Sequence, residues 1–366
     1  MNLPDVAYVT LALVPGIGRA RLARLLAHFG TAQTVLASSF EALVSVPGIS
    51  PAAATAIANA SLDAGARAVA RAEELGGRAL VPDDPDFPPA LRVIPESPTL
   101  LFVQGELSLL ERPAVAIVGS RVHSRYGAEV ARHFAAGAVS AGLVVVSGMA
   151  RGLDAVAHHA ALDADGGTVG VLGNGLGVIY PAANRALYDR VRERGCLVTE
   201  FPPGERPSAG SFPRRNRLIS GLAQATLVVE AREKSGALIT VDCALAQGRD
   251  VLAVPGPITS PTSMGCNRLI QQGAKPALTV EDLLEEYGIA ATPPDAGAGV
   301  ALSERDRGVL DALDRGLQSP DEVAAALSSP VAEALAALTD LELRGVVTCE
   351  PGRGFRRAVA GVTVGG

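Results

Sequence analysis

The sequence predicts an α/β protein whose central domain holds a mostly parallel sheet, with a helical domain before it and a small domain after it. Short, wholly apolar strands alternate with helical segments from Ala114 to Val254, as in a parallel sheet covered on both faces. Glycine turns open helices near the start, and the composition of 289–302 predicts a flexible linker. We therefore expect domains at 1–72, 73–288 and 303–366.

The composition suits a cytoplasmic protein with packed cores. Hydrophobic residues make up 48% of the 366 residues and aromatic residues only 4%, so aliphatic side chains must fill those cores. Four scattered cysteines without a CxxC pair favour free thiols in a reducing compartment over a zinc site or disulfides. We recognise no signal peptide and no run of ~18 apolar residues, so we expect neither export nor membrane spanning. We expect no metal and no cofactor.

The net charge of −6 hides an asymmetry that bears on binding partners. From Arg112 to Lys275 the chain has 18 Lys and Arg against 12 Asp and Glu, whereas residues 276–366 have 7 against 15. A basic centre attracts polyanions and an acidic tail repels them. The distribution of charge therefore permits nucleic acid at the centre, although the total charge would not suggest it.

Residues 5–62 are expected to form short helices separated by two glycine turns, Leu13–Gly18 and Val46–Ser50. Helices at Arg19–His28 and Pro51–Ala60 follow these turns. Each turn has a Pro-Gly step before a helix and resembles a helix-hairpin-helix motif, in which backbone N–H groups point toward a phosphate. The alternative is a small helical bundle whose glycines only permit tight turns, and the sequence leaves both open.

The central domain is expected to begin with extended, wrapping chain at 76–111, which is rich in proline and aspartate. Ligands of the parallel sheet that follows should bind at the carboxyl ends of its strands. The expected strands are Leu100–Gln104, Val115–Val118, Leu143–Ser147, Thr168–Leu172, Leu197–Thr199, Thr226–Glu230 and Val251–Val254. The expected helices are at about 127–140, 154–162, 182–194, 214–223 and 237–247.

The tail 303–366 is expected to form a winged helix, with three helices followed by a two-stranded hairpin. The third helix, where a DNA-reading helix would lie, contains three acidic residues against Arg344 alone. Because phosphates would repel it, we interpret this domain as a protein-contact or structural module, not as a transcription factor's DNA reader. The helices lie near 304–314, 319–327 and 330–344, and the strands at Val346–Cys349 and Phe355–Val359.

One strand of the sheet runs into a short loop formed by Gly119, Ser120 and Arg121. A dinucleotide-binding fold would have GxGxxG here. A bare backbone, a hydroxyl and a guanidinium suit a phosphate instead. The alternative is an ordinary turn at the end of a strand. The chain contains no Walker A motif, so we expect no ATP hydrolysis by P-loop chemistry.

The next strand ends in Ser147 and Gly148, and Asp154 is placed to cap the helix that follows. Asp154 and His158 lie one helical turn apart, which raises the possibility of a metal site. Two ligands on one helix are not a site, and no third is in view, so we favour a capped helix with a histidine facing the core.

Two later loops add further candidate contacts. Gly175 follows Asn174 at the end of a strand, and Tyr180 beyond them could offer a ring for base stacking or could simply be a core tyrosine. Ser235 and Gly236 open a helix whose N-terminus could hold an anion.

Three arginines, Arg214, Arg215 and Arg217, lie within four positions. Guanidinium groups this close repel one another unless an anion or several acids lie among them, and their geometry matches phosphate oxygens. Beside the Gly119–Arg121 loop, we interpret the cluster as one wall of a phosphate pocket. A solvated basic turn is the alternative, and Arg214 could still be such a solvated charge.

These segments, in this order, resemble the DNA-processing protein A family (DprA, also called Smf). They span the whole central domain, and helical N-terminal and winged C-terminal domains also occur in the family. The matching segments include Val118–Arg121, Ser147–Asp154, Val171–Leu176, Phe212–Leu222, Val229–Ala231, Ser235–Thr240, Val254–Gly256 and Gly265–Ile270.

The resemblance implies an extended Rossmann-like fold that binds single-stranded DNA and performs no catalysis. It implies protection of incoming DNA during natural transformation and loading of the recombinase RecA. It also implies a homodimer through the central domain and contact with single-strand-binding protein. The DNA-binding candidates are Gly119, Ser120, Arg121, Tyr126, Ser147, Gly148, Asn174, Gly175, Tyr180, Asn184, Arg185, Arg214, Arg215, Asn216, Arg217, Lys234, Ser235 and Gly236.

One departure from the family and one alternative function stand beside this interpretation. The family usually has an acidic and then a basic residue where this chain has Gly177 and Val178. One phosphate contact is therefore either missing or supplied from elsewhere, with Arg185 and Lys234 as the candidates. The alternative function is a lysine-decarboxylase-like nucleotide phosphoribohydrolase. Those enzymes have a Pro-Gly-Gly-x-Gly-Thr loop after the strand, whereas Ala231–Gly236 here lacks the double glycine.

Overall fold

The structure is a computed structural model that describes residues 5–289, 303–343, 346–350 and 354–357. The chain divides into two compact units, Met1–Ile289 and Ala290–Gly366. Apart from Ile289, the predicted linker at 289–302 lies outside the described residues.

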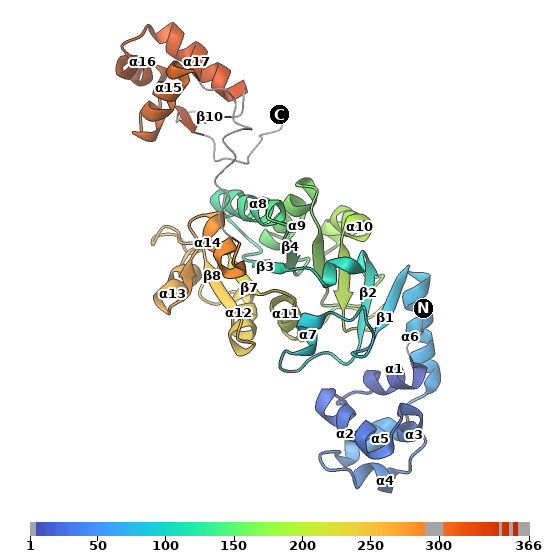
Figure 1. Cartoon of the computed structure of the whole chain (residues 1–366). Coiled ribbons are helices and arrows are strands. Elements are labelled where there is room, and N and C mark those ends of the chain that lie inside the picture. The colour runs from blue at the N-terminus through green and yellow to red at the C-terminus, as the bar shows by residue number, and fades with distance from the viewer. Residues whose placement is uncertain (1–4, 290–302, 344–345, 351–353, 358–366) are drawn as a thin grey trace. The chain divides into compact units, whose positions relative to one another are not determined.

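A nine-stranded sheet crosses the first unit in the order β1-β2-β6-β5-β4-β3-β7-β8-β9 (Figure 1). All neighbouring pairs from β6 to β9 are parallel, and β1 and β2 join the β6 side antiparallel. This arrangement confirms the predicted mostly parallel sheet. The strands are β1 (Gly77–Leu80), β2 (Leu101–Gly105), β3 (Ala114–Val118), β4 (Val144–Ser147), β5 (Thr168–Val171), β6 (Cys196–Thr199), β7 (Ala225–Val228), β8 (Asp250–Ala253) and β9 (Lys275–Pro276).

The two edge strands β1 and β9 were not expected from the sequence. β1 has four residues with Arg78 among them, and β9 has two, so neither shows the apolar run that identified the others. Residues 76–111 are also more regular than the extended chain that we predicted. They contain β1, α7 (Pro89–Arg92), β2 and the 3-10 helix η1 (Leu107–Leu110).

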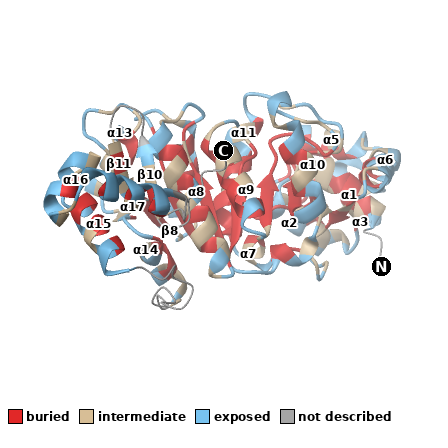
Figure 2. Ribbon diagram, turned by 90° about the horizontal axis from the view of Figure 1, so that it is seen from above, coloured by how far each residue is buried: buried red, intermediate tan, exposed pale blue. Residues whose placement is uncertain are grey.

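Helices cover both faces of the sheet, and the buried residues gather in the strands and on the inner sides of these helices (Figure 2). The helices over one face are α8 (Arg125–Ser140), α9 (Leu153–Asp163) and α14 (Val280–Leu284). Those over the other face are α7, α11 (Ser211–Leu222), α12 (Gly236–Ala246) and α13 (Met264–Gln271). The remaining elements are η2 (Ala182–Asn184), α10 (Arg185–Arg194) and η3 (Glu285–Tyr287).

Six helices precede the sheet, and the two predicted glycine turns lie among them. Gly16 and Gly48 have positive φ angles of 81° and 85°, which glycine adopts without a steric cost. Arg21 donates to the carbonyl oxygens of both glycines, so one guanidinium holds the two turns together. The helices are α1 (Val6–Leu13), α2 (Arg19–Phe29), α3 (Ala32–Leu36), α4 (Phe40–Val44), α5 (Pro51–Ala58) and α6 (Leu62–Glu74).

The second unit has the order of a winged helix, as the sequence predicted. Its first two helices begin with capping boxes, in which Ser303 pairs with Asp306 and Ser319 pairs with Glu322. Residues 358–359 of the predicted second strand lie outside the described residues. The elements are α15 (Glu304–Asp314), α16 (Pro320–Leu327), α17 (Val331–Leu343) and the antiparallel strands β10 (Val347–Glu350) and β11 (Gly354–Arg357).

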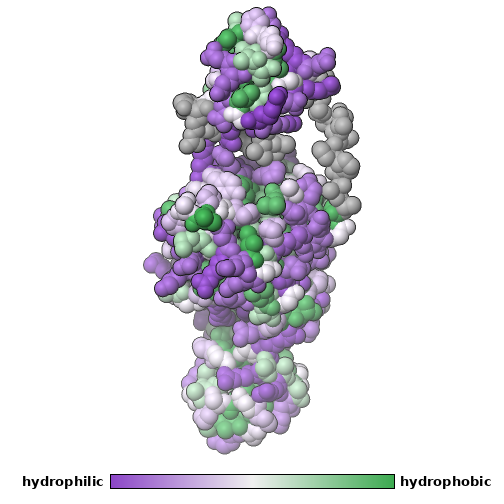
Figure 3. Space-filling model, turned by 90° about the vertical axis from the view of Figure 1, so that its left-hand side faces the viewer, coloured by the Kyte–Doolittle hydropathy of each residue, from purple (hydrophilic) through white to green (hydrophobic). Residues whose placement is uncertain are grey.

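The surface face drawn in Figure 3 carries hydrophilic side chains over most of its area. Within the described residues, no helix is both long enough and apolar enough to cross a membrane.

Candidate nucleic-acid interface

The loops that follow β3, β4 and β7 meet α11 and α12 around a hollow of about 570 Å³. We call it the large hollow. It is lined by the Gly119–Val122 loop, by Arg232 in the loop after β7, and by the first turns of α11 and α12. A hollow at the carboxyl edge of the parallel strands is where such sheets bind ligands.

The loop after β3 is held rigidly and leaves one cation exposed. A Cβ on Gly119 would lie 2.5 Å from a methyl carbon of Leu153, so the backbone packs too closely there for a side chain. The Ser120 amide donates to the backbone carbonyl of Glu230, and the Ser120 hydroxyl donates to the backbone carbonyl of Val122. Arg121 is exposed, and no carboxylate of the described residues forms an ion pair with it.

Arg215 is buried, with 4% of its surface exposed, beneath the large hollow. Its Nη1 donates to the carbonyl oxygens of Gly148 and Val171, at the ends of β4 and β5, and its Nε donates to the Asn216 side chain. Burial raises the pKa of the Asp154 carboxyl, and the charge of Arg215 opposes that rise. Arg215 therefore organises the carboxyl edge of the sheet as well as lining the hollow.

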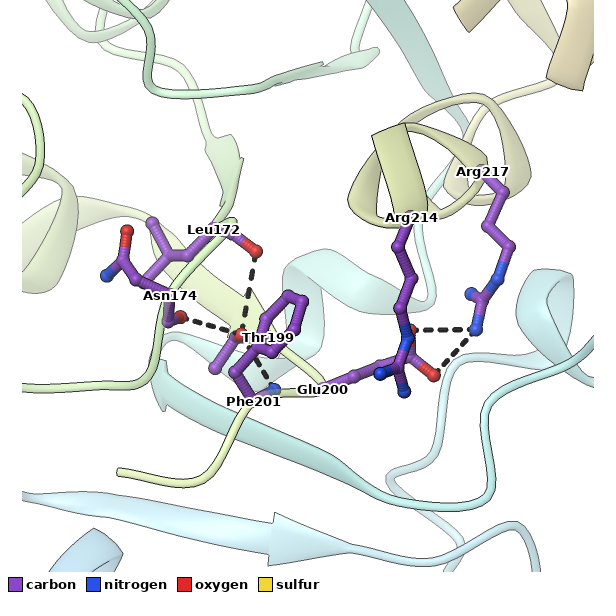
Figure 4. A network of polar contacts seen from close by, with 7 residues as sticks. All are labelled: Leu172, Asn174, Thr199, Glu200, Phe201, Arg214 and Arg217. Atoms are coloured by element: carbon purple, nitrogen blue, oxygen red, sulfur yellow. Dashed lines mark hydrogen bonds and ion pairs between the residues drawn. The ribbon is translucent and has the colours of Figure 1, made fainter. Parts of the chain in front are cut away.

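The other two arginines of the cluster meet an acid that sequence reasoning did not single out (Figure 4). Arg217 Nη2 donates to both carboxylate oxygens of Glu200 at 2.7 Å. Arg214 Nε lies 3.9 Å from the same carboxylate, and its guanidinium lies 5.3 Å from the Phe201 ring centroid. Glu200 thus supplies the negative charge that we expected a phosphate to supply. Arg217 does not line the large hollow.

A second, narrow hollow of about 30 Å³ adjoins the first, and both are lined by Arg121, Ala150, Phe212 and Arg215. We call it the narrow hollow. Tyr180, which is 44% exposed, also lines it.

The side-chain amides of the segment after β5 hold the backbone of that segment and of the loop after β4. Asn174 donates to the carbonyls of Gly175 and Val178, and Asn184 donates to those of Met149 and Ala150. In the same part of the chain, Thr199 donates to the Asn174 carbonyl and accepts from the Phe201 amide (Figure 4). These hydrogen bonds give Asn174 and Asn184 roles in shaping the loop.

A Cβ on Gly175 would lie 1.8 Å from the Pro202 carbonyl oxygen, so only glycine fits there. Arg185 is exposed at the start of α10 and does not line either hollow. Asp154 does not cap α9 as we predicted. It lies inside the first turn, and its carboxylate accepts from the Gly148 amide.

The remaining candidates divide into buried and exposed groups. Ser147 is fully buried and donates to the Ile117 carbonyl. The Tyr126 hydroxyl donates to Pro255, away from both hollows. Ser235 caps α12 by accepting from the Ala237 amide, and an added Cβ on Gly236 would meet no atom within 4 Å.

Among the residues that line the hollows, sequence reasoning missed two cations and an aromatic ring: Arg151, Arg232 and Phe212. Arg151 and Arg232 are exposed and, like Lys234, form no ion pair with a carboxylate in the described part of the chain. Arg151 and Arg232 each follow the end of a parallel strand by a few residues. The same position rule that identified Arg121 could therefore have found both.

The metal hypothesis that we rejected for Asp154 and His158 gains no support. His158 Nδ1 lies 2.7 Å from Thr168 Oγ1, which itself donates to the Val145 carbonyl, so His158 donates to Thr168. Among the described residues, no group of three His, Cys, Asp or Glu side chains could hold a metal.

Comparison with known proteins now decides the family. Residues 78–288 match the model of DNA recombination-mediator protein A. The chain belongs to this family. Residues 290–353 match the DprA winged helix domain, and residues 9–70 match a SAM-like helix-hairpin-helix tandem.

Members of the DprA family with known sequence or structure support this assignment. Protein Smf of Escherichia coli is 42% identical over 284 residues, which cover 75% of this chain and 76% of Smf. The X-ray structure of DprA from Streptococcus pneumoniae superposes with a TM-score of 0.68 at 33% identity, over 78% of this chain and 99% of that one. A Helicobacter pylori DprA structure, described for its single-stranded DNA binding mode, gives a TM-score of 0.53 at 26% identity, over 58% and 95%.

The buried histidine leads to a prediction about pH. Burial lowers the pKa of His158 from 6.5 to about 3. The unfolded chain therefore binds a proton at this histidine near pH 6.5, whereas the folded chain binds it only near pH 3. The free energy of unfolding consequently falls as the pH falls from about 6.5 to about 3. In wild type, His158 should make the free energy of unfolding about 2 kcal/mol lower at pH 5 than at pH 7. We expect His158→Asn to abolish this contribution, as measured by urea denaturation at the two pH values. The exposed His28→Asn is the matched control, and equal pH dependence in wild type and His158→Asn would contradict a neutral, buried His158.

Proposed function

We propose that this protein binds single-stranded DNA at the large hollow. The observation that carries the proposal is a set of exposed cations that follow the ends of β3 and β7. Arg121 and Arg232 line the large hollow, Lys234 lies two residues after Arg232, and none of the three forms an ion pair within the described residues. Cations without an ion-pair partner are available to phosphates, and each guanidinium group can bind two phosphate oxygens. The DprA of H. pylori, described as binding single-stranded DNA, supports the choice of ligand.

The biological role that we propose is that of a mediator of recombination. The protein would protect incoming single strands in the cytoplasm during natural transformation and load RecA onto them, with contact to single-strand-binding protein and as a homodimer through the central domain. Membership in the family supports this role. The basic balance of residues 112–275 supports the placement of DNA on the central domain.

The winged-helix unit is proposed to contact protein or to have a structural role. α17 carries Glu333, Asp340 and Glu342. Arg305 forms an ion pair with Glu333, and the Glu342 carboxylate accepts from the Cys349 amide. These two acidic groups of the helix therefore bind partners inside the winged-helix unit. A phosphate backbone would find no basic surface along this helix.

The action that we propose is binding without catalysis. The resemblance to a phosphoribohydrolase rests in part on a strand, β7, that runs into Glu230. Glu230 is only 2% exposed here, and its carboxylate accepts from the Ser124 amide, the Ser124 hydroxyl and the Thr262 hydroxyl. These bonds tie the loop after β3 to the loop after β8, which is a structural role.

A first prediction tests the absence of nucleotide hydrolysis. Incubation of the protein with nucleoside monophosphates should release no free base, because the Glu230 carboxylate is committed to Ser124 and Thr262. Chromatography of the reaction mixture measures the free base. Release that disappears in a Glu230→Gln variant would support the phosphoribohydrolase.

A second prediction concerns the ligand. The protein should bind oligo-dT more tightly than duplex DNA of equal length, and log Kd against log salt should be linear. Each phosphate neutralised on a single strand contributes about 0.7 to that slope. Filter binding across a salt series measures both quantities. Equal or tighter binding of the duplex would exclude the proposed function.

A third prediction concerns the site. Arg121→Ala and Arg232→Ala should each weaken oligo-dT binding about tenfold and lower the salt slope by about 0.7, because each removes one phosphate contact. Deletion of 303–366 should leave the affinity nearly intact.

The control is Arg132→Ala on α8, which removes an exposed charge outside both hollows. The opposite ranking, in which the deletion abolishes binding and Arg121→Ala does not change it, would place the DNA site on the winged-helix unit.

A further inference from the structure

Phe212, the second residue of α11, is partly buried but does not belong to a hydrophobic core. It is absent from all five core clusters formed by the described residues. Its ring instead contacts both a cation and another aromatic ring. The guanidinium carbon of Arg121 is 5.6 Å from the Phe212 centroid, and the Tyr180 centroid is 5.4 Å away with the two rings inclined at 36°.

The backbone makes room for this ring. A Cβ on Gly173 would lie 2.8 Å from the Phe212 ring, so the ring packs directly against the glycine at the end of β5. The residue before it, Ser211, is fixed because its hydroxyl donates to Ser208 and accepts from the Ser208 amide. Phe212 is therefore held between the loop after β3, which carries Arg121, and the loop after β5, which leads to Tyr180.

The two neighbours of Phe212 suit different parts of a nucleotide. Arg121 lines the large hollow, where the cations suit phosphates. Tyr180 lines the narrow hollow and is 44% exposed, so a base can reach its side chain. The Phe212 ring beside it would support a tyrosine that receives a base.

We propose that Phe212 is a positioning residue that couples a base contact at Tyr180 to a phosphate contact at Arg121. The inference rests on the proposed binding of single-stranded DNA. The Phe212 ring packs beside Tyr180 and also holds the Arg121 guanidinium by a cation–π contact. Loss of the ring should then weaken both contacts together, although Phe212 itself need not touch DNA.

The test compares two ligands of equal charge: oligo-dT, and the same oligonucleotide with abasic positions. Stacking on an aromatic ring favours the strand with bases, and wild type should prefer oligo-dT by about tenfold. Phe212→Ala and Phe212→Leu should lose most of this preference, as should Tyr180→Ala. Phe212→Tyr, which keeps the ring, should retain it. The salt slope of Phe212→Ala should also fall by about 0.7 as Arg121 is released.

Phe40→Ala, which removes an exposed phenylalanine from α4, is the control and should behave as wild type. Thermal unfolding of each variant shows whether the fold is intact, and Phe212→Leu serves if Phe212→Ala does not fold. Equal weakening of both ligands by both Phe212 variants would overturn the coupling, since it indicates a structural role alone. Unchanged preference would overturn it as well. Failure of wild type to bind either oligonucleotide would instead remove the proposed function itself.

Discussion

The buried guanidinium of Arg215 is the interaction on which the candidate interface depends. It hydrogen-bonds the carbonyl groups at the ends of β4 and β5, and α11 carries it to that place. A buried cation is costly unless it is hydrogen-bonded and lies near an opposite charge, and the two carbonyls together with the charge of Asp154 provide these. The helix is thereby fixed over the carboxyl edge of the sheet. Phe212 near its start and Asn216 in its middle take their positions at the hollows from this contact.

Acidic side chains of the central domain have a related role, because they connect loops to one another. Glu230 holds the loop after β3 to the loop after β8, and Glu200 holds two arginines of α11 at the end of β6. These carboxylates bind partners within the protein and do not line the large hollow. Arg121, Arg151 and Arg232 are thus exposed without ionic partners among the described residues, which gives an acidic chain a basic site.

The three clustered arginines show how one sequence motif can serve three purposes. Helical geometry sends neighbouring side chains about 100° apart around the axis. Arg215 therefore points into the sheet edge, Arg217 reaches Glu200, and Arg214 lies exposed over Phe201. A phosphate was the simplest neutralising partner that the sequence suggested for the cluster, and the fold provides the Glu200 carboxylate to Arg214 and Arg217 instead.

The sequence by itself determined the succession of strands and helices along the chain, the mostly parallel sheet and the Gly119–Arg121 loop. Apolar runs, helical periodicity and strand-end glycines are local signals, so they can be recognised without the fold. Edge strand β1 contains Arg78 and edge strand β9 has only two residues, so neither carries an apolar run. Only the tertiary structure decided which arginines are free, since Glu200 lies 14 residues before Arg214 and nothing local links them. It also decided that Phe212 lies outside the core. Whether a side chain binds a ligand or a neighbour depends on contacts between distant segments, and those arise only when the sheet brings its strand ends together.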